Sequence, residues 1–262
     1  MLVRRIIIIV GVVIILFLSG VAIYVFRPPE AASGPLEAIP IVVPTTIPTA
    51  TSAVAALPTP TVDSIPSTAD PTTVAPTTVA SQPTLQIFAI DQNRSEARFL
   101  IDEVLRGQPV TVVGVTNQVA GQIALDPNVP SAAQVGVIQI NARTLATDNE
   151  FRNRAIKNAI LRTNQFELIT FTPRIINGLP ESVTIGVPFE FTIEGDLTIT
   201  DVTRPVTFTV TVTPISPTEI SGLAQTTILY RDFNLTIPDS PAVDTVADEV
   251  RLELEFVATL IG

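Results

Sequence analysis

Hydrophobic and polar residues alternate along most of the chain from residue 85 onward. The alternation is clear over residues 96–102, 189–194, 206–213 and 250–256, where one row is aliphatic or aromatic and the other is mainly Thr, Glu, Asp or Arg. A period of two is typical of a strand with one buried and one wet face. Clusters of Gly, Pro, Asn and Asp separate the runs, as turns do. The pattern predicts roughly eight or nine long strands in an all-β, mainly antiparallel domain.

One segment, residues 147–162, departs from this pattern. Its apolar residues recur at helical spacing and form one stripe: Phe151, Ala155, Ile156, Ala159 and Ile160. Residues 147–150 have the Thr-x-x-Glu form of a capping box, which predicts a helix start there. A lone amphipathic helix must bury its stripe, and we expect it to do so at the mouth of the sheet domain.

The N-terminal part is uniformly apolar. Residues 6–26 carry no charge, and at about 1.5 Å per residue a helix of this length spans the ~30 Å hydrocarbon core of a bilayer. We therefore expect residues 1–27 to be a transmembrane anchor. Arg4 and Arg5 precede the run, so the positive-inside rule leaves the N-terminus in the cytoplasm and exports the rest. The alternative is a signal peptide cleaved near the small residues 31–33, which would make the domain secreted.

Residues 28–84 are rich in Pro, Thr, Ala, Ser and Val and poor in aromatic residues. Pro lacks an amide donor and fixes φ, so neither helix nor sheet is expected to propagate. We expect a disordered linker that leans toward polyproline II and separates the anchor from the domain. As a flexible coil it would have a root-mean-square span of about 40 Å. The chain thus divides into an anchor at 1–27, a linker at 28–84 and a β domain at 85–262.

Composition excludes several function classes. The chain has no Cys and no His, which removes disulfides, thiolate sites, the commonest general base and the commonest metal ligand. Carboxylates are plentiful, but they fall on polar strand faces or in turns, where acids are usually solvated. The formal net charge of −10 makes the chain a poor partner for nucleic acid phosphates. We expect no enzyme activity, no catalytic residue, no metal, no cofactor and no nucleic acid.

The inward rows allow two interpretations. An eight-stranded closed sheet is just wide enough to be filled by side chains or to hold one elongated ligand. If the rows meet, the domain is a structural or interaction module of the cell envelope. If they enclose space, it is a binding protein. The edge strands of an incompletely closed barrel could also pair, which would give a dimer.

Several short segments, in order, resemble the YceI-like family of exported polyisoprenoid-binding proteins over about residues 86–260. They are FAID at 88–91, SEARF at 95–99, TLATDN at 144–149 with Arg152, FEL at 166–168, GDLTI at 195–199, VTRPV at 202–206 and RDFNL at 231–235. The segments GDLTI and VTRPV together are the most specific match to the family. The resemblance implies an extended lipocalin-like β-barrel, an extracytoplasmic location and a long apolar cavity for an isoprenoid chain.

With this resemblance, we expect a membrane-tethered, extracytoplasmic protein that binds a long apolar lipid, isoprenoid or quinone-like. The residues expected to line the tunnel or its entrance are Phe99, Ile101, Phe151, Ile156, Ile160, Phe189, Phe191, Phe208 and Phe256. The alternative function remains an envelope module with a filled core and no ligand.

Overall fold

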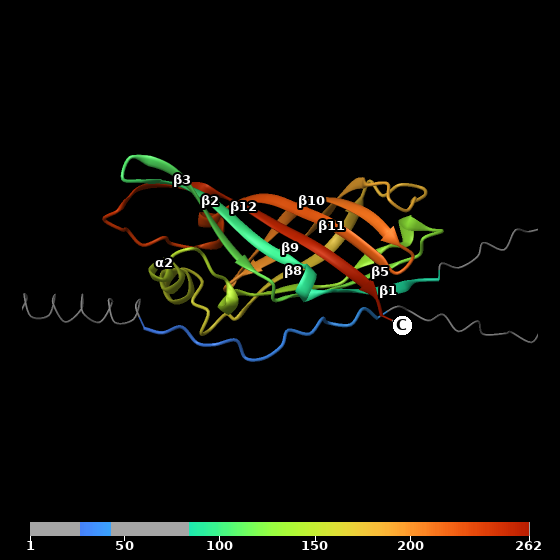
Figure 1. Ribbon diagram of the computed structural model, residues 1–262, viewed down its shortest axis with the longest axis horizontal. Helices are drawn as coiled ribbons and strands as arrows, with labels where there is room; N and C mark the ends of the chain where they lie inside the picture. Colours follow the sequence, from blue (N-terminus) through green and yellow to red (C-terminus); the bar gives the residue numbers. More distant parts are fainter. Residues whose placement is uncertain (1–26, 43–83, 262) are drawn as a thin grey trace, which may run out of the picture. The chain divides into compact units, whose positions relative to one another are not determined.

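The computed structural model describes residues 27–42 and 84–261. Within these ranges, twelve strands form one antiparallel sheet that curls into a half-barrel (Figure 1). The strands are β1 Gln86–Ile90, β2 Glu96–Leu105, β3 Gln108–Thr116, β4 Val119–Ala120, β5 Gln122–Leu125, β6 Gln134–Val135, β7 Ile138–Asn141, β8 Leu168–Asn177, β9 Phe189–Ile199, β10 Val202–Ser216, β11 Glu219–Leu229 and β12 Val243–Leu260.

Helical segments are short and interrupt the strands. The helix α2 covers Glu150–Ala155 and continues as one π-helical turn, η4, over Ile156–Ile160. The 3-10 turns are η1 Gln92–Arg94, η2 Pro130–Ala132, η3 Ala142–Thr144 and η5 Tyr230–Phe233. The predicted all-β, mainly antiparallel class is confirmed, and the one predicted helix is present but shorter than the expected residues 147–162.

Hydrogen bonding orders the sheet β4-β7-β8-β9-β10-β11-β12-β1-β5-β6, and β2 and β3 continue from β12. The longest strand, β12, pairs with β11 along one edge and with β2 and then β1 along the other. Because only η1 separates β1 from β2, the two behave as one interrupted run. Every pair is antiparallel, as expected for a chain without helical crossovers.

A second interrupted run joins opposite edges of the sheet. Strand β4 pairs with β7, whereas β5, which begins one residue later, pairs with β1. The residue between them is Gly121, where any side chain would collide with Ile138. The chain therefore changes partners at a position without a side chain. Such interruptions also explain why the structure has more strands than the periodicity predicts.

The predicted alternation is confirmed along the long strands. In β10, Val210 and Val212 are buried, whereas Thr209 is exposed. In β12, Phe256 is buried and the preceding Glu255 is exposed. The concave face of the sheet therefore carries the apolar rows, and its convex face carries the polar ones.

The helix begins later than the capping-box pattern predicts. Its N-cap is Asn149, whose side chain accepts hydrogen bonds from the backbone N–H groups of Phe151 and Arg152 (2.9 and 3.1 Å). Thr147 instead donates its backbone N–H and hydroxyl to the side-chain oxygen of Asn153 (2.7 and 2.8 Å). The prediction that Thr147 is the N-cap was therefore wrong. Asn and Thr can both cap a helix, and the local sequence alone does not choose between them.

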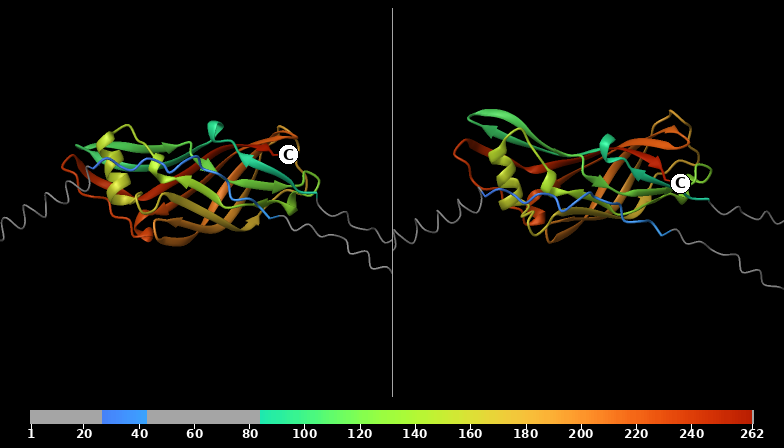
Figure 2. Two further views of the ribbon diagram at one scale, coloured as in Figure 1. Left: turned by 90° about the horizontal axis from the view of Figure 1, so that it is seen from below. Right: turned by 60° about the horizontal axis from the view of Figure 1, so that its bottom comes forward.

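Residues 27–41, named the strap here, run along the outside of the half-barrel from α2 toward β5 (Figures 1 and 2). At one end, the side chain of Asn158 in η4 donates to the backbone carbonyl of Arg27 (2.8 Å). At the other end, the backbone N–H of Ile41 donates to the side-chain oxygen of Gln122 (2.8 Å). The strap thus follows the domain over much of its length.

The middle of the strap is held by polar groups. The backbone N–H and the hydroxyl of Ser33 both donate to the Glu167 carboxylate (2.7 and 2.5 Å), which also pairs with Arg143 (3.1 Å). Burial acts to raise the pKa of Glu167, but the Ser33 donors and Arg143 outweigh it and hold that pKa below its ordinary value. Farther along, Gln92 donates to the carbonyl of Leu36 (2.5 Å).

The predicted transmembrane run, residues 6–26, and most of the predicted linker lie outside the described residues. Across the two described ranges, no helix is long and apolar enough to cross a membrane. The division of the chain into anchor, linker and domain stays a prediction.

Candidate functional site: an apolar cavity

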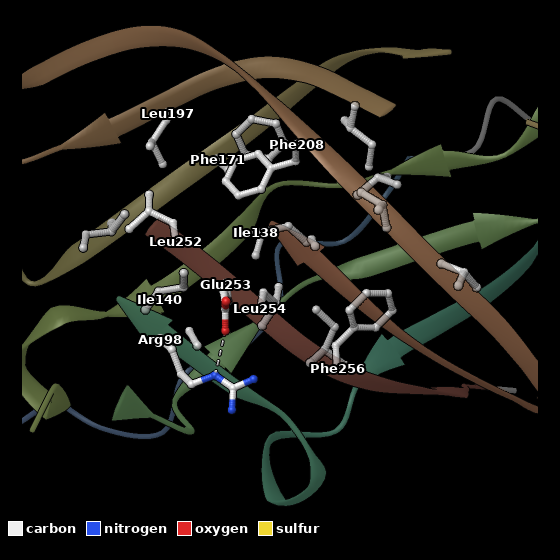
Figure 3. Close-up of a pocket in the computed structure, with 18 of the residues that line it drawn as sticks. Arg98, Ile138, Ile140, Phe171, Leu197, Phe208, Leu252, Glu253, Leu254 and Phe256 are labelled. Atoms are coloured by element: carbon white, nitrogen blue, oxygen red, sulfur yellow. Dashed lines mark ion pairs between the residues drawn. The ribbon is translucent and has the colours of Figure 1, made fainter. Parts of the chain in front are cut away.

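The concave face of the sheet surrounds a cavity of about 620 Å³. Every strand named above except β4 contributes to its lining. Most of the lining side chains are aliphatic or aromatic (Figure 3). The volume lies in the range of protein ligand sites, roughly 300–1,000 Å³. The inward rows of the described domain therefore enclose space, and its core is not filled.

The cavity is long. Strand β10 lines it from Phe208 to Ser216, a stretch that spans about 26 Å at ~3.3 Å per residue. One end, named the α2 end, is bounded by α2 and η4, with Ile156 in the lining. The other, the far end, is bounded by the loop after β5 and the turn between β10 and β11, with Pro127 and Pro217 in the lining.

Most of the predicted lining residues reach this cavity. Those that do are Phe99, Ile101, Ile156, Ile160, Phe189, Phe191, Phe208 and Phe256. The exception is Phe151, which is 67% exposed and lies with its ring centroid 6.0 Å from the guanidinium carbon of Arg154. Of the predicted apolar stripe, only Ile156 and Ile160 reach the cavity, and both belong to the π-helical turn η4. Phe151 lies in α2, one turn earlier. A role of any of these residues in lipid binding stays a prediction.

Three aromatic rings lie against the wall of the cavity, each over an inward-facing glycine. A Cβ added at Gly195 would be 2.6 Å from the ring of Phe171, and one at Gly222 would be 2.6 Å from the ring of Phe256. Phe99 lies over a third glycine in the same way. Because the glycines leave room beside the backbone, the rings do not need to project into the middle of the cavity.

The α2 end holds a buried ion pair that the sequence analysis did not predict. Glu103 stands on the inward, otherwise apolar row of β2, and its side chain is 7% exposed. Arg152 of α2 donates to it (3.0 Å) and also to the exposed Asp148 (2.6 Å). The pair ties the helix over the end of the cavity. The sequence did contain a signal for this pair. Glu103 falls on a row that the alternation predicts to be buried, and a buried carboxylate requires a cationic partner.

Other charged groups differ between the two ends. Near α2, burial lowers the pKa of Lys157, and the charge of Glu150 opposes that effect. At the far end, the backbone N–H groups of Asn128 and Thr84 donate to Asp126 (2.8 and 2.7 Å) and lower its pKa. The far end therefore holds a fixed negative charge at neutral pH.

Ion pairs between β2 and β12 strengthen the wall. Arg98 of β2 is the register partner of Glu253 of β12, with 3.2 Å between Nε and Oε2 (Figure 3). The same guanidinium contacts Glu255 at 3.1 Å. These contacts hold β2 against β12.

Many acidic side chains of the described residues serve in ion pairs. Several are paired with arginines, including Asp201 with Arg162 (2.9 Å) and Asp248 with Arg231 (2.7 Å). In residues 27–42 and 84–261, no group of three or more Asp or Glu side chains is placed to hold a metal ion.

Comparison with known proteins agrees with this geometry. The sequence model of the YceI-like domain matches residues 88–258. Among solved structures, the chain is similar to a polyisoprenoid binding domain from Saccharophagus degradans implicated in plant cell wall breakdown (14% identity, 66% of this chain and 98% of that chain, TM-score 0.55). It is also similar to BcnA from Burkholderia cenocepacia (20% identity, 65% and 99%, TM-score 0.53). No curated protein matches the chain. At these identities the structures show a shared fold.

We expect Gly195→Ala to destabilise the domain. The new Cβ would lie 2.5 Å from the Thr172 carbonyl oxygen and 2.6 Å from the Phe171 ring, and overpacking of this kind costs about 1–3 kcal/mol. Urea unfolding measures the loss. Gly34→Ala is the matched control, because nothing lies within 4 Å of its added Cβ, and its effect should stay within about 0.5 kcal/mol. Equal effects would contradict the close packing.

We expect Arg152→Met to loosen α2, because it leaves the Glu103 carboxylate buried without its partner. The cost is about 1–3 kcal/mol, visible as faster amide hydrogen exchange in residues 150–160. Arg154→Met, on the same helix, leaves the pair intact and serves as the control. Adding Glu103→Gln to Arg152→Met should recover part of the loss, since the unpaired charge is removed. A double variant as loose as the single one argues against the ion pair.

Proposed function

Because this chain belongs to the YceI-like family, we propose that it binds a long apolar lipid, of isoprenoid or quinone type, inside its half-barrel. The observation that carries the proposal is the cavity of about 620 Å³ with its apolar lining. A space this long and apolar suits a hydrocarbon chain and offers a compact polar metabolite few partners.

The free energy of binding depends on the source of the lipid. Moving one CH₂ group out of water is worth about 0.8 kcal/mol, so a lipid in the cavity rarely escapes into water. A lipid drawn from a bilayer gains almost nothing from the hydrophobic effect, because its surroundings were already apolar. Selection must then come from shape. The stacked rings of Phe189 and Phe191, with centroids 5.8 Å apart, offer a ridged surface to a methyl-branched chain.

The class of lipid follows by analogy with a protein of the same fold. The Saccharophagus degradans structure is of a polyisoprenoid binding domain. This supports an isoprenoid chain for the present protein over a straight acyl chain. Quinones stay within the proposal because their tails are isoprenoid as well.

The proposal includes a position at the membrane. The uncharged residues 6–26, preceded by Arg4 and Arg5, support an anchor with a cytoplasmic N-terminus and an extracytoplasmic domain. Anchoring would raise the local concentration of the cavity beside its source of lipid. The proposal contains no catalytic step and no cofactor.

Lipid extraction tests the proposal directly. The full chain is purified from membranes of cells that make isoprenoid lipids, and its organic extract is analysed by mass spectrometry. We expect one apolar lipid in near-stoichiometric amount. A protein that carries no lipid and takes up no added prenyl alcohol would contradict lipid binding.

Ala224→Trp should empty the cavity of lipid. Ala224 is a small lining residue of β11, so an indole there occupies ligand space. If the lipid must overcome an overpacking penalty of about 1–3 kcal/mol, its affinity falls roughly 5- to 150-fold. Gln225→Trp places the same side chain on the exposed face of the strand and should keep wild-type occupancy. If both variants retain lipid equally, the lipid is bound elsewhere.

A further inference from the structure

The cavity reaches both ends of the half-barrel, and the strap distinguishes these ends. Its first residue, Arg27, is held at the α2 end by Asn158, which is 1% exposed. Its last residue, Ile41, lies toward the far end on Gln122 of β5. The strap therefore has one direction along the domain, from α2 to β5 (Figure 2).

The domain is fitted to the strap at more than one point. Ser33 donates twice to Glu167, and the Arg143 side chain beside it is only 11% exposed. Ile41 packs onto Gly136, where an added Cβ would be 2.9 Å from its Cγ1. The Glu167–Arg143 pair thus contacts the middle of the strap, and Gly136 leaves room for its last residue. Such contacts favour a docked strap over a free coil.

Residues 28–84 were predicted to separate the anchor from the domain, but the docked strap occupies the first part of that segment. The chain re-enters the described structure at Thr84, whose backbone N–H donates to Asp126 (2.7 Å). Gln122 begins β5 and Asp126 directly follows it, so Ile41 and Thr84 are both hydrogen-bonded beside the same strand. Arg27 itself is held against the domain by Asn158. A wholly free linker would instead allow a separation of about 40 Å.

We propose that the α2 end is the surface that faces the lipid bilayer, and that the docked strap holds it there so that lipid enters the cavity at this end. The inference rests on the proposed membrane anchor, whose apolar run ends at Phe26, directly before Arg27. At no more than about 3.6 Å per residue, the α2 end then stays within about 10 Å of the end of the anchor. Phe151, 67% exposed on α2, suits the interfacial layer of a bilayer.

Single cysteines can test this orientation, because the chain has no Cys of its own. Glu150→Cys puts a fluorophore on the exposed start of α2, and Ser182→Cys puts one on the exposed loop between β8 and β9. That loop is at the far end, where Gly186 donates to the carbonyl of Pro214. The full chain is reconstituted in phosphatidylcholine nanodiscs whose lipids carry a spin label on the head group, which quenches only nearby fluorophores.

We expect several-fold stronger quenching of the label at position 150 than of the label at position 182. Equal quenching, or stronger quenching at 182, overturns the inference. The comparison uses the unmodified strap, so it does not depend on how any strap variant folds.

A strap variant then tests the cause of the orientation. Ser33→Ala with Glu167→Gln removes the hydroxyl donor and the charge that hold the middle of the strap, and amide hydrogen exchange of residues 28–41 shows whether the strap is released. We expect quenching at position 150 to fall toward the value at 182, because a released strap lets the domain turn. Glu181→Gln, an exposed residue in the β8–β9 loop, is the matched control and should change nothing. Undiminished quenching in a folded variant whose strap exchanges its amide hydrogens freely would show that the strap does not set the orientation.

The outcomes separate this inference from the proposed function. Unequal quenching by a protein that carries no isoprenoid lipid and takes up no added prenyl alcohol contradicts lipid binding and leaves the orientation standing. Bound lipid with equal quenching contradicts the orientation alone. A chain that does not insert into the nanodisc has no anchor, and the inference falls with it.

Discussion

The domain must keep its inward apolar rows apart, and the rest of the structure depends on this constraint. An apolar cavity made by mutation costs about 24 cal/mol per Å³, so leaving several hundred Å³ empty would cost as much as the whole stability of a typical domain. Continuous antiparallel pairing holds the wall in place, and the glycines under Phe171 and Phe256 keep those rings out of the middle. A hydrocarbon chain in the space would supply the contacts that collapse would otherwise provide.

Periodicity predicted the wall because the inward and outward rows of a strand are a local property. A residue two positions along faces the same side whatever the strand pairs with, which is why Phe189, Phe191 and Phe208 were assigned to the lining from sequence. The one helix was predicted for a similar reason. The openness of the interior was not predictable in this way, since the same rows can equally pack together.

Features that join distant parts of the chain escaped the sequence analysis. The Glu103–Arg152 pair links residues 49 positions apart, and Ser33 meets Glu167 across 134 positions. The strap was assigned to a linker because its composition resembles that of the residues after it, and only its partners on the domain set it apart. The misplaced helix start is a smaller error, since the sequence offered two residues that can cap a helix, Thr147 and Asn149.

The uneven distribution of pairing around the sheet has a consequence for the width of the lumen. Strand β4 meets β7 through only two residue pairs, Val119–Ile140 and Ala120–Gln139, whereas β9 and β10 are paired along eleven. Expansion to admit a thicker chain would therefore take place at β4–β7 and at β5–β6, which is also paired along only two residues, because few hydrogen bonds are strained there. The length of the lumen has no such compliant element, because the long strands determine it. A domain built in this way discriminates more strictly by the length of a guest than by its girth.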